Sequence, residues 1–390
     1  MELEKKNKQY MSKIIPYGKQ YINSADFLSV EKSLKKPLIT TGKFVKKFED
    51  KISKFLGVNY VATSNNGTSA LHLSFLATGI KKNDIIIMPI INFIASYSMC
   101  KILGAKIYFA DVDKSTGQIT PDTITECIKI NKLKNIKAIV VQCMGGYPEN
   151  SLEFFRLKNK LKCLLIEDAC HAFGAKYFYK KRLIMVGSCK HADASVFSFH
   201  PLKPITTGEG GCVTTNNKKV YNKLIKLRSH GIERNKLNHW NYDVKMLGYN
   251  YRLSDINCAL GLSQLGKLKK FINRRKTIYN YYKKNLDGYR NMISFPNYRL
   301  RNNPSFHLIL VNFNFKNLKQ KDKFLNYMKK NDILCQYHYI PLNKLSVVQE
   351  RQSKIKNYKE YYLKTISIPI YHSILLKELK YVVKKIKQYF

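Results

Sequence analysis

The chain has 390 residues, of which 45% are hydrophobic, so it is long enough for a large core and is expected to form two domains. Its 69 Lys and Arg against 26 Asp and Glu give a formal net charge of +43. Because the basic residues are spread along the whole chain, we expect neither a nucleic acid nor a membrane as partner.

Apolar runs typical of strands alternate with helix-like segments in the first half of the chain. The runs are 60–63, 84–88, 105–110, 136–141, 164–166, 194–199 and 211–215. This alternation predicts an α/β fold with a mostly parallel sheet flanked by helices. The segment between the last two runs is too short for a parallel crossover, which predicts a mixed sheet.

A long helix-like stretch begins at about Ile256 and runs into the charged residues 273–276. Its apolar positions recur at helical spacing, and it is a plausible bridge into a second, smaller α+β unit that ends at Phe390. We therefore expect a large domain at 1–265, whose N-terminal segment contacts the substrate, and a small C-terminal domain at 266–390.

The nine cysteines are odd in number, include no C-x-x-C pair and mostly lie in apolar runs. This pattern favours buried free thiols in a reducing compartment and argues against a metal site. The charged segment 1–8 is not followed by an apolar core, and the apolar stretch 85–100 is too short for a membrane span. We expect a cytoplasmic protein that holds no metal.

Two charged residues follow apolar runs of the predicted sheet. Asp168 comes at the end of the run 164–166, and Lys203 lies between the run 194–199 and a glycine-rich turn. Residues just past the carboxyl ends of parallel strands face the ligand crevice, so these side chains are expected to converge. A lysine that forms a Schiff base, with a carboxylate aimed at a pyridinium nitrogen, is the arrangement that pyridoxal 5'-phosphate requires. The alternative is a solvated surface lysine, but a position between a strand-like run and a glycine-rich turn is unusual for one.

A small polar loop precedes the first apolar-periodic helix after the run 60–63. Its residues are Asn66, Gly67, Thr68 and Ser69. Free backbone N–H groups at a helix start, helped by hydroxyl groups, form a phosphate site, although an ordinary helix cap would read the same way. Ser198 could supply another hydroxyl to the same phosphate. Phe93 follows an apolar run and could lie flat on the pyridine ring, with core packing as the alternative.

Several longer segments resemble the DegT/DnrJ/StrS sugar aminotransferases, which are fold-type I pyridoxal phosphate enzymes. The matching segments are 15–20, 66–73, 167–175, 198–211, 228–231 and 247–255. Within that family, the segments 198–207, 229–232, 259–265 and 337–341 are most similar to members that act in pseudaminic acid biosynthesis. Those members transfer an amino group from L-glutamate to C4 of a UDP-linked 4-keto-6-deoxy-N-acetylhexosamine.

The resemblance implies a role for particular residues and a homodimer with shared sites. Lys203 and Asp168 become the catalytic pair, Ser198 contacts the phosphate, and Asn250 reaches the phosphate from the neighbouring subunit. The residues that correspond to sugar-nucleotide contacts in the family are Tyr17, Pro37, Leu38, Ile39 and Thr40. The matching histidines are His171 on the cofactor and His230 and His338 on the substrate; a structural histidine remains the alternative for each of the three.

Two positions depart from the family pattern, and three other readings stay open. Met144 and Cys170 are bulkier than usual, which puts the substrate in doubt but not the reaction. A sugar dehydratase would carry histidine in place of Lys203. An aminotransferase for another keto nucleotide sugar, of the perosamine, bacillosamine or legionaminic acid type, is the serious competitor. A regulatory or nucleic-acid-binding relative would need a concentrated basic patch.

Overall fold

A mixed seven-stranded sheet forms the centre of the molecule, in a computed structural model that describes residues 14–235, 237–238, 240–299, 301–350 and 355–390. Its strands, in spatial order, are β1 (Tyr60–Ser64), β9 (Gly211–Thr215), β8 (Ala194–Ser198), β5 (Leu164–Asp168), β4 (Ile136–Gln142), β2 (Ile85–Pro89) and β3 (Lys106–Ala110). β9 runs antiparallel to both of its neighbours, and the other pairs are parallel. The predicted mixed, mostly parallel sheet is therefore confirmed.

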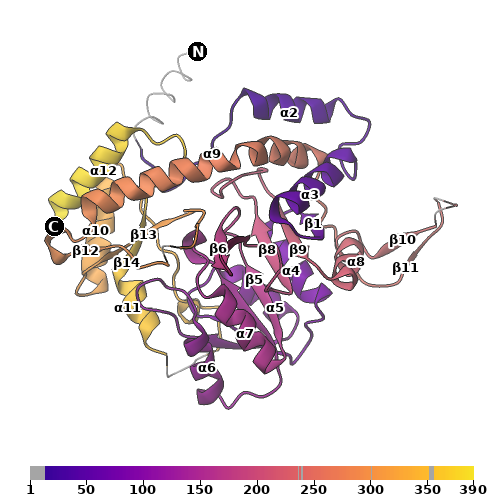
Figure 1. Cartoon of the computed structure of the whole chain (residues 1–390), viewed down its shortest axis with the longest axis horizontal. Helices are drawn as coiled ribbons and strands as arrows, with labels where there is room; N and C mark the ends of the chain where they lie inside the picture. The colour runs from indigo at the N-terminus through magenta and orange to yellow at the C-terminus, as the bar shows by residue number, and fades with distance from the viewer. Residues whose placement is uncertain (1–13, 236, 239, 300, 351–354) are drawn as a thin grey trace.

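Helices cover both faces of this sheet (Figure 1). One face carries α4 (Gly67–Ala77), α5 (Ile94–Ile102) and α8 (Lys218–Leu227), and the other carries α3 (Lys43–Leu56), α6 (Pro121–Ile130), α7 (Ser151–Leu161) and the start of α9 (Asp255–Leu286). In β4, Val140 packs on the first face while Ile139 and Val141 pack on the second. Strands buried on both sides must be apolar throughout, which explains why the sequence shows continuous runs.

A second core lies around a three-stranded antiparallel sheet toward the C-terminus. Its elements are β12 (Ile293–Ser294), β13 (Ile309–Phe313), β14 (Thr365–Ile368), α10 (Leu318–Lys330), α11 (Asn357–Lys364) and α12 (Leu376–Tyr389). α9 joins the two cores, since Leu265 packs in the first and Ile278 in the second. We propose a domain boundary between residues 265 and 266, which falls inside α9. Residues 1–13 of the proposed large domain lie outside the described part of the chain.

The remaining elements are short and were not expected from the sequence. They are α2 (Ser24–Leu34), the pairs β6 (Lys176–Tyr179) with β7 (Arg182–Met185) and β10 (Ile232–Arg234) with β11 (Tyr242–Val244), and the 3₁₀ turns η1 (Met144–Gly146), η2 (Tyr289–Asn291) and η3 (Leu342–Lys344). α2 lies along α9, and the β10–β11 hairpin projects from the body (Figure 1). Within the described ranges, no helix combines the length and apolar character needed to cross a membrane.

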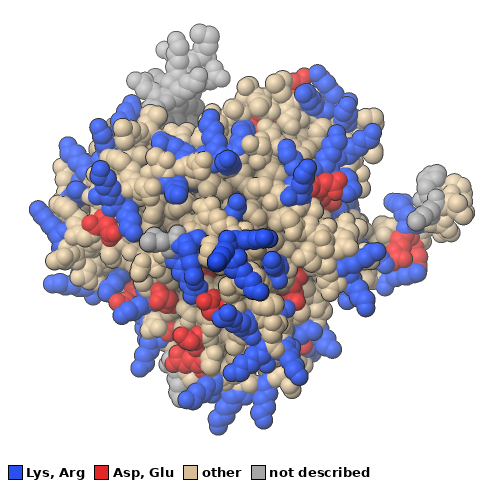
Figure 2. Space-filling view, in the orientation of Figure 1, with Lys and Arg blue, Asp and Glu red and all other residues tan. Residues whose placement is uncertain are grey.

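The surface is basic without a single basic patch on the face that Figure 2 shows. Lys and Arg side chains are spread over that whole face, with fewer acidic groups between them. The cysteines are all free, and most of them are buried, as the sequence predicted.

The Asp255 carboxylate ties the start of α9 to the start of α3. It is fully buried and accepts the backbone N–H groups of Gly42 at 2.6 Å and Phe44 at 2.7 Å. These N–H groups lie at the N-terminal end of α3, where the helix dipole favours a negative charge. One side chain thus satisfies two half-buried donors and fixes the crossing of the two helices.

Asp255→Ala is expected to lower the free energy of unfolding by about 3 kcal/mol, because it leaves half-buried N–H groups without an acceptor. Urea denaturation monitored by circular dichroism measures this change. Asp50→Ala is the control, since Asp50 is an exposed residue of α3 that forms a surface ion pair with Lys46; its effect should stay below about 0.5 kcal/mol. Equal effects of the two substitutions would show that Asp255 is not a structural anchor.

Candidate active site

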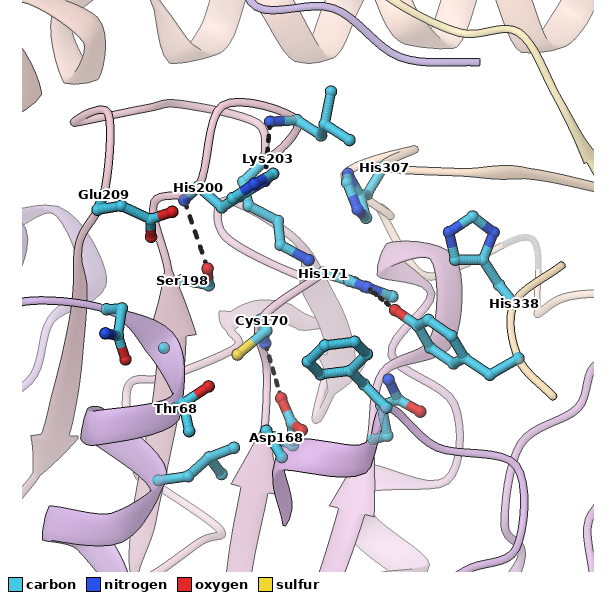
Figure 3. A pocket seen from close by; sticks show the side chains of 18 of the residues that line it. Thr68, Asp168, Cys170, His171, Ser198, His200, Lys203, Glu209, His307 and His338 are labelled. Carbon is cyan, nitrogen blue, oxygen red and sulfur yellow. Dashed lines mark hydrogen bonds between the residues drawn. The ribbon is translucent and has the colours of Figure 1, made fainter. Parts of the chain in front are cut away.

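A cavity of about 440 Å³ opens at the carboxyl ends of β4, β5 and β8 (Figure 3). Its lining residues are Tyr17, Asn66, Gly67, Thr68, Leu71, Phe93, Ala95, Gln142, Asp168, Cys170, His171, Ser198, His200, Leu202, Lys203, Glu209, His307, His338 and Tyr339. The volume suits a small organic ligand. This position at the end of the sheet is the one that the sequence predicted.

Asp168 and Lys203 both line the cavity, from neighbouring parts of the sheet. Asp168 is the last residue of β5 and is 3% exposed; its carboxylate accepts the Ser96 hydroxyl at 3.0 Å and the Cys170 N–H at 3.3 Å. Both donors are neutral, so they orient the carboxylate without cancelling its charge. Figure 3 shows Asp168 and Lys203 in the same pocket, with the Lys203 amine directed inward.

Lys203 is held by the turn that connects β8 to β9. The Lys203 N–H donates to the His200 carbonyl at 2.9 Å, and the Thr207 N–H donates to the Phe199 carbonyl at 3.0 Å. Burial lowers the pKa of the Lys203 amine, and the neighbouring Cys170 and Asp168 side chains oppose that shift. The amine is therefore easier to deprotonate than a surface lysine, as a nucleophile or base requires.

The start of α4 combines a helix cap with an open anion cradle. The Asn66 side chain accepts the Ser69 N–H at 2.8 Å, and the Ser69 hydroxyl donates to the Asn65 side chain at 2.5 Å. The helix-cap reading therefore holds for Asn66 and Ser69, and the Ser69 side chain is outside the cavity lining. The Thr68 side chain is exposed on the cavity side, so its hydroxyl could accept or donate a hydrogen bond to a phosphate.

Gly67 and Ser198 touch at this cradle. A Cβ atom on Gly67 would stand 2.9 Å from the Ser198 Cβ and 3.2 Å from its hydroxyl oxygen. Only glycine permits the start of α4 to approach β8 this closely, which places the Thr68 and Ser198 hydroxyls on one wall of the cavity.

Phe93 presents its ring to the cavity instead of packing in the core. The side chain is 51% exposed, and its ring centroid is 5.7 Å from that of Tyr339. An exposed aromatic ring on a cavity wall is available to stack on a planar ligand. The core-packing alternative is therefore not what the structure shows for this residue.

Three buried imidazoles lie around Lys203. Burial and the Lys203 charge lower the pKa of His171 and of His338, the latter to about 3. Burial, followed by the charges of His171 and Lys203, also lowers the pKa of His307 well below its usual value. All three are therefore neutral near pH 7, and they act as hydrogen-bonding groups with no charge of their own.

The other predicted site residues gather outside this cavity. Leu38 and Ile39 are 60% and 47% exposed, and Pro37, Thr40 and Asn250 are also exposed. Backbone pairing connects them through the segment 249–254: Thr40 pairs with Ser254, Ser229 pairs with Asn250, and the His230 N–H donates to the Tyr249 carbonyl at 2.9 Å. They form a strip beside α4, since the Asn65 N–H donates to the Tyr251 carbonyl at 2.9 Å.

Five polar lining residues were not selected from the sequence: Gln142, His200, Glu209, His307 and Tyr339. Gln142 ends β4 as Asp168 ends β5, and the two residues are direct partners in the parallel ladder, so the same strand-end rule could have found it. Cys170 lines the cavity, whereas Met144 is fully buried in the core and is not a lining residue.

The sheet with helices on both faces, and the lysine and carboxylate at its strand ends, define an α/β protein with a cavity suited to Schiff-base chemistry. The chain belongs to the DegT/DnrJ/EryC1/StrS aminotransferase family, whose model matches residues 20–387. It is 37% identical over 373 residues to the UDP-4-amino-4,6-dideoxy-N-acetyl-beta-L-altrosamine transaminase of Campylobacter jejuni, covering 95% of this chain and 96% of that protein. It is 31% identical to the GDP-perosamine synthase of Escherichia coli O157:H7, covering 90% and 91%.

Solved structures with the same fold cover nearly the whole chain. PseC of Helicobacter pylori, an aminotransferase involved in the biosynthesis of pseudoaminic acid, superposes with a TM-score of 0.86 at 28% identity and covers 97% of this chain and 99% of that one. Spr1654 of Streptococcus pneumoniae, in its PLP form, gives a TM-score of 0.87 at 23% identity and covers 96% and 98%. The chain is thus an aminotransferase by family, and the predicted fold-type I architecture is confirmed.

Gly67→Ala is expected to weaken the binding of pyridoxal phosphate about tenfold, because the new methyl group must displace Ser198 and such overpacking costs about 1–3 kcal/mol. Titration of the cofactor-free protein, followed by tyrosine and cofactor fluorescence, measures the change. Gly266→Ala is the control, since a Cβ at this α9 position meets no atom within 4 Å. An unchanged dissociation constant for Gly67→Ala would show that the start of α4 does not hold the ligand.

Proposed function

We propose that the protein transfers an amino group from L-glutamate to C4 of a UDP-linked 4-keto-6-deoxy-N-acetylhexosamine, with pyridoxal 5'-phosphate as cofactor. The observation that carries the proposal is the presence of Lys203 and Asp168 in one cavity, in a chain whose relative at 37% identity is a UDP-4-amino-4,6-dideoxy-N-acetyl-beta-L-altrosamine transaminase. We further propose that it serves a nucleotide-sugar pathway of the pseudaminic acid type. The free cysteines support a reducing, cytoplasmic compartment.

The lining residues fit pyridoxal phosphate. The Lys203 amine can bind its aldehyde carbon, the Asp168 carboxylate can pair with its ring nitrogen, and the exposed Phe93 ring can stack on its ring face. Because Gly67 has no side chain, the start of α4 lies close to Ser198, and this part of the cavity wall can bind the phosphate of the cofactor. His171 is proposed to contact the cofactor from the opposite side of the cavity.

The proposed reaction gives Asp168 and Lys203 separate roles in controlling protons. When bound, pyridoxal phosphate supplies a ring that accepts the electron pair left on the donor carbon after deprotonation. Asp168 would keep the ring nitrogen protonated, because a buried carboxylate favours a cation beside it. The Lys203 amine, whose pKa is lowered by burial, would accept the proton from the donor carbon and then deliver it to the cofactor.

Substrate contacts are proposed both for predicted residues that line the cavity and for predicted residues that lie outside it. Tyr17 and His338 lie in the cavity, with ring centroids 5.7 Å apart, and are proposed to contact the sugar. Residues 37–40, His230 and Asn250 lie in the exposed strip, where we propose that they act on the site of a second subunit. A homodimer with shared sites gives the exposed residues Leu38 and Ile39 a role that one chain alone does not.

A second keto nucleotide sugar is the alternative substrate. The similarity to a GDP-perosamine synthase at 31% identity over 90% of the chain favours it. The bulkier Cys170 on the cavity wall would act on this choice, because it narrows the pocket beside Asp168. A panel of UDP-linked and GDP-linked 4-keto sugars, with product analysis by mass spectrometry and NMR, separates the two functions.

Lys203→Ala is expected to abolish transamination of the UDP-linked 4-keto sugar by L-glutamate, because no other amine takes its place beside Asp168 in the cavity lining. Product formation is measured by mass spectrometry, and the visible band of the cofactor-loaded protein should disappear in this variant. The exposed Lys51 of α3 provides the control, Lys51→Ala, which should keep wild-type turnover. Normal turnover in Lys203→Ala would contradict the proposal.

Mixing Lys203→Ala with Asn250→Ala protein is expected to restore about a quarter of the wild-type activity, because random exchange of a twofold dimer rebuilds one intact site in each heterodimer. The mixture is partially dissociated, reassociated and assayed, and mass spectrometry verifies that heterodimers have formed. Each variant treated alone is the control. Heterodimers without any recovered activity would place Asn250 in the same site as its own Lys203.

A further inference from the structure

The tautomer of His171 is fixed by the backbone. The Gly145 N–H donates to Nδ1 of His171 at 3.3 Å, so this nitrogen carries no proton. Because burial keeps the imidazole neutral, its single proton must be on Nε2. A backbone N–H neither titrates nor reverses its polarity, so this assignment holds across the working pH range.

The direction of the next hydrogen bond follows from that tautomer. Nε2 of His171 lies 2.9 Å from the Tyr339 hydroxyl, so the imidazole N–H donates and the phenol oxygen accepts. Burial raises the pKa of Tyr339 well above its usual value, so the phenol keeps its own proton. Within the described ranges this hydroxyl has no other protein partner, and Tyr339 lines the cavity.

The geometry assigns to Tyr339 the role of a substrate-binding residue that donates a hydrogen bond into the cavity, with His171 as its positioning residue. A phenol that already accepts from His171 can satisfy its O–H only with an acceptor that enters the site. This inference rests on the proposed function, which it extends to a specific contact. The acceptor is an oxygen of a bound substrate, either a carboxylate oxygen of the amino donor or an oxygen of the keto sugar.

The tautomer of His171 tests the first step without any substrate. Nitrogen-15 NMR of histidine-labelled protein, with the His171 signals assigned from a His171→Asn variant, should show a protonated Nε2 and an unprotonated Nδ1 from about pH 6 to pH 8. A proton on Nδ1 would make Tyr339 the donor to His171 and would overturn the inference. This result does not depend on whether the proposed substrates are turned over.

The two half-reactions, measured separately in stopped flow, test the second step. Tyr339→Phe keeps the ring near Phe93 and removes only the hydroxyl, so kcat/KM should fall about tenfold or more in one half-reaction while the cofactor spectrum stays unchanged. A loss with L-glutamate identifies a carboxylate as the acceptor, and a loss with the UDP-linked 4-keto sugar identifies a sugar oxygen.

Tyr337→Phe is the matched control. It makes the same chemical change in the same segment, but the Tyr337 hydroxyl donates to Asp322 at 2.7 Å, and Tyr337 does not line the cavity. Wild-type rates in both half-reactions for Tyr339→Phe, or equal losses in Tyr337→Phe, would overturn the inference. If the wild-type protein converts neither substrate, the proposed function fails, and the NMR result still decides the direction of the hydrogen bond.

Discussion

The buried carboxylate of Asp168 is the group on which the rest of the site depends. It stands at the end of β5, only 3% exposed, and is oriented by Ser96 and Cys170 through neutral hydrogen bonds. Removing a carboxylate from water is costly unless a cation or several donors meet it. The protein supplies part of that compensation, and the cationic ring nitrogen of the proposed cofactor would supply the remainder. Binding of such a ligand would thus relieve an electrostatic cost that folding has already incurred.

The second core supports the site through hydrogen bonds, most of which join a side chain to a backbone carbonyl group. The guanidinium of Arg275, on α9 and almost fully buried, donates to the carbonyls of Phe306 and His307 at 3.3 and 3.0 Å. The Ser305 hydroxyl donates to the His171 carbonyl at 2.7 Å, and the Ser305 N–H donates to the Gly146 carbonyl at 3.0 Å. These bonds place His307 beside His171, with ring centroids 4.4 Å apart. The α9 helix is therefore both the link between the cores and a support for the cavity wall.

The sequence predicted the parts of the fold and site that local patterns determine. The seven central strands, Lys203, Asp168 and the start of α4 follow from apolar runs and from the rule that strand ends face the ligand. His307 and Tyr339 could not be found in this way, because their segments lie outside the central sheet and reach the cavity through tertiary contacts that no local pattern reveals. Met144 shows the converse: its departure from the family pattern put the substrate in doubt, yet packing buries it in the core, away from the cavity lining.

A cavity lined by one amine, two carboxylates and four imidazoles of lowered pKa must control many of its hydrogen bonds by direction instead of by charge. An imidazole that gained a proton here would stand beside the Lys203 amine, and the repulsion is one reason that the pKa of His338 falls to about 3. Neutral imidazoles can nevertheless exist in two tautomers, and each tautomer reverses the polarity of the groups it contacts. The Gly145 N–H removes that freedom at His171. Fixed polarity at this point sets the orientation of the Tyr339 hydroxyl and, through it, which substrate atoms the cavity can accept.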